Sequence, residues 1–242
     1  MVSDPRDALL YVVLADTAVL GVIIVCFWVG VFVARRLGYP VGYGLGALGF
    51  VRPRIGYRAG MWLGSSVGLG ALFLSFLLIP LSTLVFETLG YSVRSDMQEP
   101  LLHGIQDWVG ESPGTAILAA ISVVVLFGPA AEEIIFRGVL FGSLYKLGTA
   151  LSRELRGHGK GAGKLGERIS FAFAALVSST SFALLHLEPL FVATLFVLAI
   201  ILCALYRWTG SLFTSFVAHA TFNSFAVLSI ILAGLGVLPA QV

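Results

Sequence analysis

The chain contains 242 residues, of which 58% are hydrophobic and only 12% are charged. A soluble domain carries about 25% charged residues, so we expect an integral membrane protein whose main solvent is lipid. Its 15 basic and 13 acidic residues nearly balance, which argues against a nucleic-acid partner, because such proteins carry strongly basic faces.

Six apolar segments are long enough to cross a bilayer as helices, for which about 20 residues are needed. The predicted fold is therefore an all-α, polytopic transmembrane helical bundle of about six spans. We expect a single membrane domain over residues 1–242, with N-terminal spans and loops at 1–114 and a core at 115–225. The six spans are predicted at residues 9–34, 60–89, 115–147, 169–186, 190–206 and 211–235.

The loops between these spans predict the orientation of the chain. Segments 35–59 and 145–168 are basic, whereas the intervening loop over 90–114 is acidic. Because cytoplasmic loops are enriched in Lys and Arg, the two basic segments are expected in the cytoplasm and both termini outside. The Gly- and Lys-rich stretch at 157–166 is expected to be a flexible, solvated loop.

The third apolar segment is too long for one untilted span and has Gly128 and Pro129 at its middle. Proline inside a helix removes a backbone donor, so the segment is predicted to be a kinked or broken helix. Broken membrane helices usually line a cavity. Glu132 and Glu133 then fall in the first turn after the break, where the helix dipole favours negative charge.

Charged residues are expensive in a membrane, at about 2.5–3.5 kcal/mol each on insertion scales. Arg137 follows Glu133 by four residues, so the two share a helix face and can form a structural ion pair. Glu132 points about 100° away and needs a different partner or a proton.

Candidate partners for Glu132 lie on two other segments. His186 ends the fourth span, and His219 and Asn223 share one face of the sixth. Counted from the loop near residue 147, Glu132 and His186 lie about 22–26 Å up their helices, whereas His219 lies about 12 Å above Ser211. A tilt of the helices, or re-entry of the chain into the membrane before Ser211, must remove this difference in height between Glu132 and His219. Each of these residues alone can be explained by packing between helices. Together, the four polar residues that are costly to place in a membrane indicate a functional site: Glu132, His186, His219 and Asn223.

These residues resemble the CPBP family of membrane proteins, which includes type II CAAX prenyl endopeptidases and bacteriocin-processing or immunity proteins. The family carries EExxxR, FxxxH and HxxxN/D motifs on successive core helices. The chain has these motifs in the same order, as Glu132-Glu133-x-x-x-Arg137, Phe182-x-x-x-His186 and His219-x-x-x-Asn223.

The resemblance implies an intramembrane, metal-independent glutamate protease that needs no cofactor. By this resemblance Glu132, assisted by His186, activates a water, and His219 and Asn223 stabilise the oxyanion. Glu133, Arg137 and Phe182 would support the motif helices. The implied partners are membrane lipid and a peptide or protein substrate, lipid-modified substrates included. The implied location is the plasma membrane of a prokaryote.

Three alternatives to this mechanism and function remain open. Glu132, His186 and His219 are also suitable zinc ligands, which gives a zinc-dependent version of the same protease, although no His-Glu-x-x-His motif is present. A non-catalytic immunity or scaffold protein, or a proton or solute pathway, would also place acids inside a membrane. No internal repeat supports transport.

Overall fold

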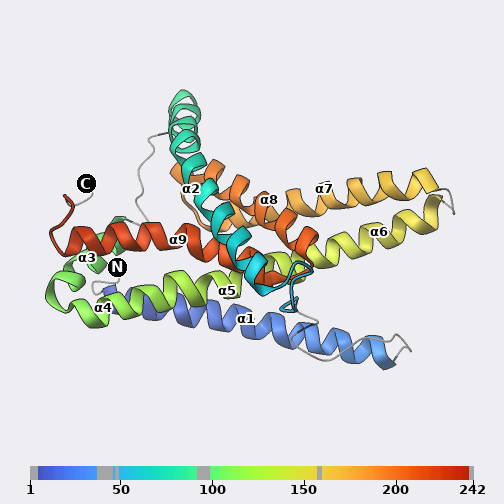
Figure 1. Ribbon diagram of the computed structural model, residues 1–242, viewed down its shortest axis with the longest axis horizontal. Coiled ribbons are helices and arrows are strands. Elements are labelled where there is room, and N and C mark those ends of the chain that lie inside the picture. The colour runs from blue at the N-terminus through green and yellow to red at the C-terminus, as the bar shows by residue number, and fades with distance from the viewer. Residues whose placement is uncertain (1–4, 37–45, 47–48, 92–98, 157–159, 240–242) are drawn as a thin grey trace.

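In the computed structural model, the described residues are 5–36, 46, 49–91, 99–156 and 160–239, and every regular element among them is helical (Figure 1). Five helical stretches are long and apolar enough to cross a membrane, and Leu20–Val33 is a shorter apolar stretch within the first helix. The prediction of an all-α, polytopic bundle is therefore confirmed. The five stretches are Tyr57–Thr88, Pro113–Ser152, Gly163–Leu185, Pro189–Thr209 and Leu212–Gly234.

The helices follow the predicted order, with one addition. A short helix, α3, occupies part of the segment between the second and third spans, and it packs on the last helix, α9. The elements are α1 (Pro5–Arg36), α2 (Tyr57–Thr88), α3 (Glu99–Glu111), α4 (Pro113–Ala120), η2 (Ile121–Phe127), α5 (Gly128–Glu132), η3 (Glu133–Phe141), α6 (Gly142–Arg156), α7 (Lys160–Leu185), η4 (Pro189–Phe191), α8 (Val192–Thr209) and α9 (Leu212–Gly234).

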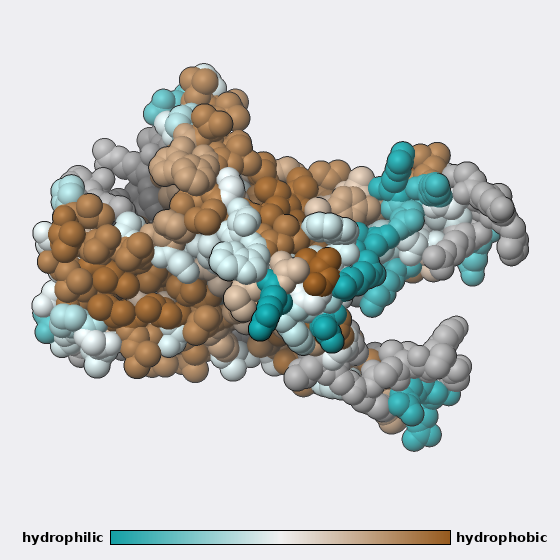
Figure 2. Space-filling model, in the orientation of Figure 1, coloured by the Kyte–Doolittle hydropathy of each residue, from teal (hydrophilic) through white to brown (hydrophobic). Residues whose placement is uncertain are grey.

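The third and fourth spans are longer than predicted and form a protruding hairpin. Helix α6 continues to Arg156 and α7 begins at Lys160, so residues 160–166 are helical and not a flexible loop. Small residues allow the two helices to approach closely, because a Cβ atom on Gly166 would lie 2.6 Å from Ser152 Cβ. Hydrophilic surface gathers on this hairpin and, on the same side of the view, near the start of α2 and the end of α1, whereas the opposite side is mostly hydrophobic (Figure 2).

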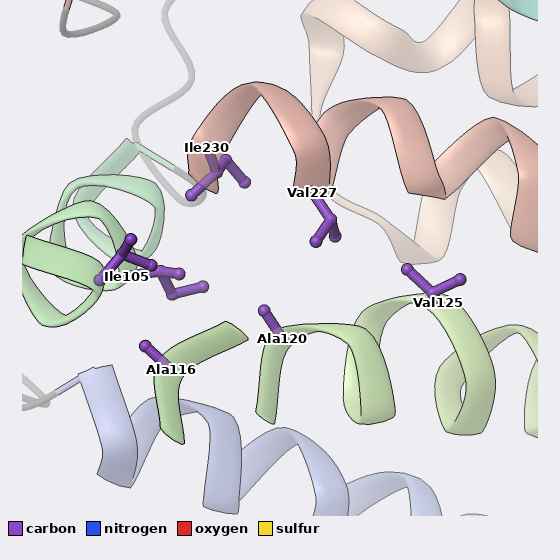
Figure 3. Packing of buried hydrophobic residues seen from close by; sticks show 7 residues of the cluster. Ile105, Ala116, Ala120, Val125, Val227 and Ile230 are labelled. Atoms are coloured by element: carbon purple, nitrogen blue, oxygen red, sulfur yellow. The ribbon is translucent and has the colours of Figure 1, made fainter. Parts of the chain in front are cut away.

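Two sets of contacts fix α9, the helix that carries two of the predicted site residues. On one side, the buried residues of α3, α4 and η2 pack against Val227 and Ile230 (Figure 3). On the other side, α2 presents Gly60, Gly64 and Gly68 to α9. A Cβ atom on Gly68 would lie 2.4 Å from the carbonyl oxygen of Ala218, so the two backbones are in contact there.

The turn between α8 and α9 is held by the segment that precedes α2. The backbone N–H of Arg54 donates to Thr209 O at 2.9 Å, and its guanidinium donates to Trp208 O at 3.1 Å. A cation at a helix C-terminus also interacts favourably with the helix dipole. The Leu212 N–H donates to Gly49 O at 2.9 Å, so the start of α9 is anchored as well.

The glycine contact between α2 and α9 is open to a direct test. We expect Gly68→Ala to lower the free energy of unfolding by about 1–3 kcal/mol, because the added methyl group overlaps the backbone of α9. Gly70→Ala is the matched control on the same helix, since a Cβ atom there meets no atom within 4 Å. Thermal unfolding of both variants in detergent measures the difference, and equal melting temperatures would contradict this contact.

Candidate functional site

The helix that carries the two glutamates is continuous through Pro129 but changes its hydrogen-bond register. Two π-helical stretches, η2 and η3, flank the short helix α5 that contains Pro129 and ends at Glu132. The predicted distortion therefore takes the form of wider π turns on both sides of the proline. Such turns occur frequently at functional sites, because they redirect side chains and backbone groups.

Glu133 is the centre of a fully buried polar group. Its Oε1 lies 3.0 Å from Arg137 Nη1, and both side chains have 0% exposure. The same oxygen lies 3.1 Å from His219 Nδ1 on α9. Glu133 thus contacts a cation on its own helix and an imidazole on another, and its negative charge is compensated within the protein.

Phe182 explains how α7 takes part in this arrangement. The Arg137 guanidinium carbon lies 4.4 Å from the centre of the Phe182 ring, which is a cation–π contact. The same ring lies 5.6 Å from the His219 ring and 4.5 Å from the His186 ring, measured between centroids. Phe182 therefore contacts Arg137, His186 and His219, and so links α7 to η3 and α9.

Glu132 has different surroundings from Glu133. Its side chain is 25% exposed, and its Oε2 lies 3.5 Å from His219 Nε2. The two carboxylates therefore face opposite nitrogens of one imidazole. That separation is longer than a usual direct hydrogen bond, and Oε2 makes no hydrogen bond to any described residue.

The hydrogen bond to Glu133 determines what His219 can offer to Glu132. A carboxylate only accepts, so Nδ1 carries the hydrogen, and this tautomer follows from the partner. Neutral His219 then presents a lone pair at Nε2, whereas the imidazolium presents a second N–H. In either state a proton can pass between Nε2 and a group held beside Glu132.

His186 and Asn223 both bond to backbone carbonyls. His186 Nδ1 lies 2.7 Å from Phe182 O, one turn earlier on α7, and so it must be the protonated nitrogen. The Asn223 amide nitrogen donates to Val124 O on η2 at 3.0 Å. Of the predicted residues, five lie in one group: Glu132, Glu133, Arg137, Phe182 and His219. The His186 ring contacts Phe182 of this group at a tilted angle, and Asn223 joins α9 to the segment before Pro129.

The predicted difference in height between Glu132 and His219 is absent from the structure. Helix α6 continues beyond residue 147, so that position is no common floor for the helices. Glu132 Oε2 lies 3.5 Å from His219 Nε2, so the two side chains lie at the same level.

Two buried polar residues near the site were not predicted. Ser178 donates to Phe136 O at 2.9 Å and so ties α7 to η3. Glu188, in the turn after α7, is only 2% exposed. A serine in an apolar helix and an acid beside a proline give no sequence signal for burial, since both also occur at membrane interfaces.

Among the residues that the structure describes, no group of three or more His, Cys, Asp or Glu side chains is placed so that it could hold a metal ion.

Comparison with known proteins gives a family for the region that contains the site. Residues 114–225 match the family described as type II CAAX prenyl endopeptidase Rce1-like. This region includes all seven residues singled out from the sequence. No solved structure gives a significant match.

Two curated proteins are similar to part of the chain. The membrane-embedded CAAX protease MroQ of Staphylococcus aureus strain USA300 is 31% identical over 105 residues, which are 43% of this chain and 36% of MroQ. YdiL of Bacillus subtilis strain 168, whose name assigns it provisionally to the membrane peptidases, is 28% identical over 113 residues. That match covers 47% of this chain and 38% of YdiL, so the similarity spans well under half of either relative.

The two adjacent glutamates should differ sharply in their effect on stability. Glu133→Gln leaves the buried Arg137 charge without its counter-ion, and we expect a loss of about 3–5 kcal/mol. Glu132→Gln removes a partly exposed carboxylate that faces His219 at 3.5 Å and is not paired with Arg137, and we expect a change of less than about 1 kcal/mol. Thermal unfolding in detergent measures both, and equal losses would show that the two carboxylates are not distinguished in this way.

Proposed function

Because residues 114–225 match the family of Rce1-like type II CAAX prenyl endopeptidases, we propose that this integral membrane protein is an intramembrane endopeptidase. In this proposal Glu132 activates the water that attacks the peptide bond. The observation that carries the proposal is the contrast between the two carboxylates. Glu133 is compensated by Arg137, whereas Glu132 is partly exposed and faces His219 at 3.5 Å.

The proposed reaction begins with transfer of a proton from water to Glu132 while the water oxygen bonds to the peptide carbonyl carbon. The carbonyl becomes a tetrahedral oxyanion, and His219 and Asn223 stabilise it by donating hydrogen bonds. The carbon–nitrogen bond then breaks, and the proton held by Glu132 passes to the amine that leaves. His219 can donate to the oxyanion from Nε2 only as the imidazolium, because its Nδ1 hydrogen is already directed at Glu133.

His186 is proposed to assist Glu132 through its second ring nitrogen. Since Nδ1 donates to Phe182 O, Nε2 is the nitrogen that can accept a hydrogen bond from the attacking water. Glu133, Arg137 and Phe182 act as support in this proposal, because they touch His219 or each other and no reacting atom. No metal or other cofactor takes part in the proposed steps.

The proposed partners follow from the membrane location and the relatives. The five apolar spans require contact with lipid, and a CAAX protease among the relatives supports a peptide or protein substrate, lipid-modified substrates included. Both relatives are bacterial, which supports the plasma membrane of a prokaryote as the location.

The proposal is tested by comparing peptide termini in membranes that contain wild type or Glu132→Gln. We expect one or more cleavage products to disappear in the variant, because glutamine keeps the shape of the side chain and cannot accept the proton. Glu87→Gln is the control, since it removes the negative charge of an exposed glutamate on α2, just as Glu132→Gln removes one negative charge. Identical termini in all three membranes, at equal protein levels, would favour the scaffold or immunity function over hydrolysis.

A second test separates the metal-free mechanism from the zinc-dependent one. Once a cleaved substrate is known, we expect the cleavage rate in detergent to be unchanged by a strong zinc chelator. Loss of activity with the chelator, followed by recovery on addition of Zn²⁺, would assign Glu132, His186 and His219 to a metal instead.

A further inference from the structure

Pro129 leaves one carbonyl of the motif helix without a backbone donor. In η2 the last hydrogen bond runs from the Gly128 N–H to Val123 O, which is the π-helical spacing of five residues. The next bond in that register would run from residue 129 to Val124 O, but proline has no N–H. Gly128, the alternative donor in the α-helical register, already bonds to Val123. The Val124 carbonyl therefore depends on a donor from outside its own helix.

Asn223 supplies that donor. Its amide nitrogen lies 3.0 Å from Val124 O, and a carbonyl can only accept, so the nitrogen of the amide must face it. An unsatisfied carbonyl is costly in a membrane, where water cannot replace the missing donor. His219 lies one turn earlier on α9 and contacts Glu132 and Glu133 after the proline. Helix α9 thus bonds to the motif helix on both sides of Pro129.

We propose that Asn223 is a positioning residue that replaces the hydrogen-bond donor missing at Pro129 and so fixes the two glutamates relative to His219. The catalytic meaning of this position rests on the proposed function, whereas the hydrogen bond and its effect on the helix do not. One hydrogen of the amide is used by Val124, and the second is the one that can reach a substrate oxygen. The spacing of His219 and Asn223 then serves to hold a proline-interrupted helix as well as to line a site.

A double-mutant cycle between positions 129 and 223 tests the proposal in the full-length protein in detergent. Asn223→Ala should lower the melting temperature by about 3 °C or more. Pro129→Ala restores a backbone N–H to the helix, either at residue 129 or by return of Gly128 to the α-helical register. In that background Asn223→Ala should cost less than half as much. Ser224→Ala is the control, because its hydroxyl bonds to Ala220 O within α9 and should cost the same in both backgrounds.

A second readout tests positioning apart from stability. The chain has 4 histidines, so ¹⁵N-histidine NMR can follow the His219 ring once His219→Gln identifies its signal. Asn223→Ala should shift this signal, and the double variant should return it toward its wild-type value. An equal melting-temperature loss in both backgrounds, or a His219 signal unchanged by Asn223→Ala, would overturn the proposal. Neither readout needs a substrate, so a failure of the proposed peptidase activity would be seen separately.

Discussion

The buried contact of Glu133 with Arg137 and His219 is the constraint on which the rest of the site depends. Two charges with 0% exposure cannot be left uncompensated in a membrane, so the two helices that supply the group, η3 and α9, must meet at that depth. Arg137 neutralises Glu133, and Glu133 in turn fixes the tautomer of His219. Glu132 is then the carboxylate left to face the other side of the imidazole. The adjacent glutamates have different environments because consecutive helical residues point about 100° apart, one toward the protein interior and the other toward the partly open side.

The surrounding helices are built to keep these groups in place. Glycines on α2 allow backbone contact with α9, and Arg54 anchors the turn before it. Ser178 bonds to the π-helical segment after Pro129, while Asn223 bonds to the segment before it. In a soluble protein, water could satisfy these carbonyls. In lipid, side chains of neighbouring helices must do so, and each such bond also fixes the position of one helix against another.

Much of the architecture was predictable from the sequence because lipid imposes simple rules. Apolar length predicted the spans, and the spacing of Glu133 and Arg137 predicted that they share a helix face. The ends of α6 and α7 were not predictable, since their small-residue contacts depend on which helices become neighbours. The same limit produced the mistaken height for His219, because the extension of α6 beyond residue 147 moved the reference level.

The contacts between the site residues were harder to predict than which residues belong to the site. A sequence shows that His219 and Asn223 share a face, but it does not show that one imidazole meets both glutamates. Likewise, Pro129 predicts a lost donor, yet only the fold shows that η2 adopts π geometry and that Val124 is the carbonyl affected. These details depend on the rotation and depth of each helix, which periodicity fixes only to within about a turn.

The most direct test of this account is the distance between the Glu132 carboxylate and His219 Nε2, measured in an experimental structure of the full chain in lipid nanodiscs. We predict a separation that is direct or bridged by one water, with Glu133 on the opposite nitrogen and in contact with Arg137. A Glu132 side chain turned toward the acyl chains, with no water-bridged path to either His219 or His186, would contradict it.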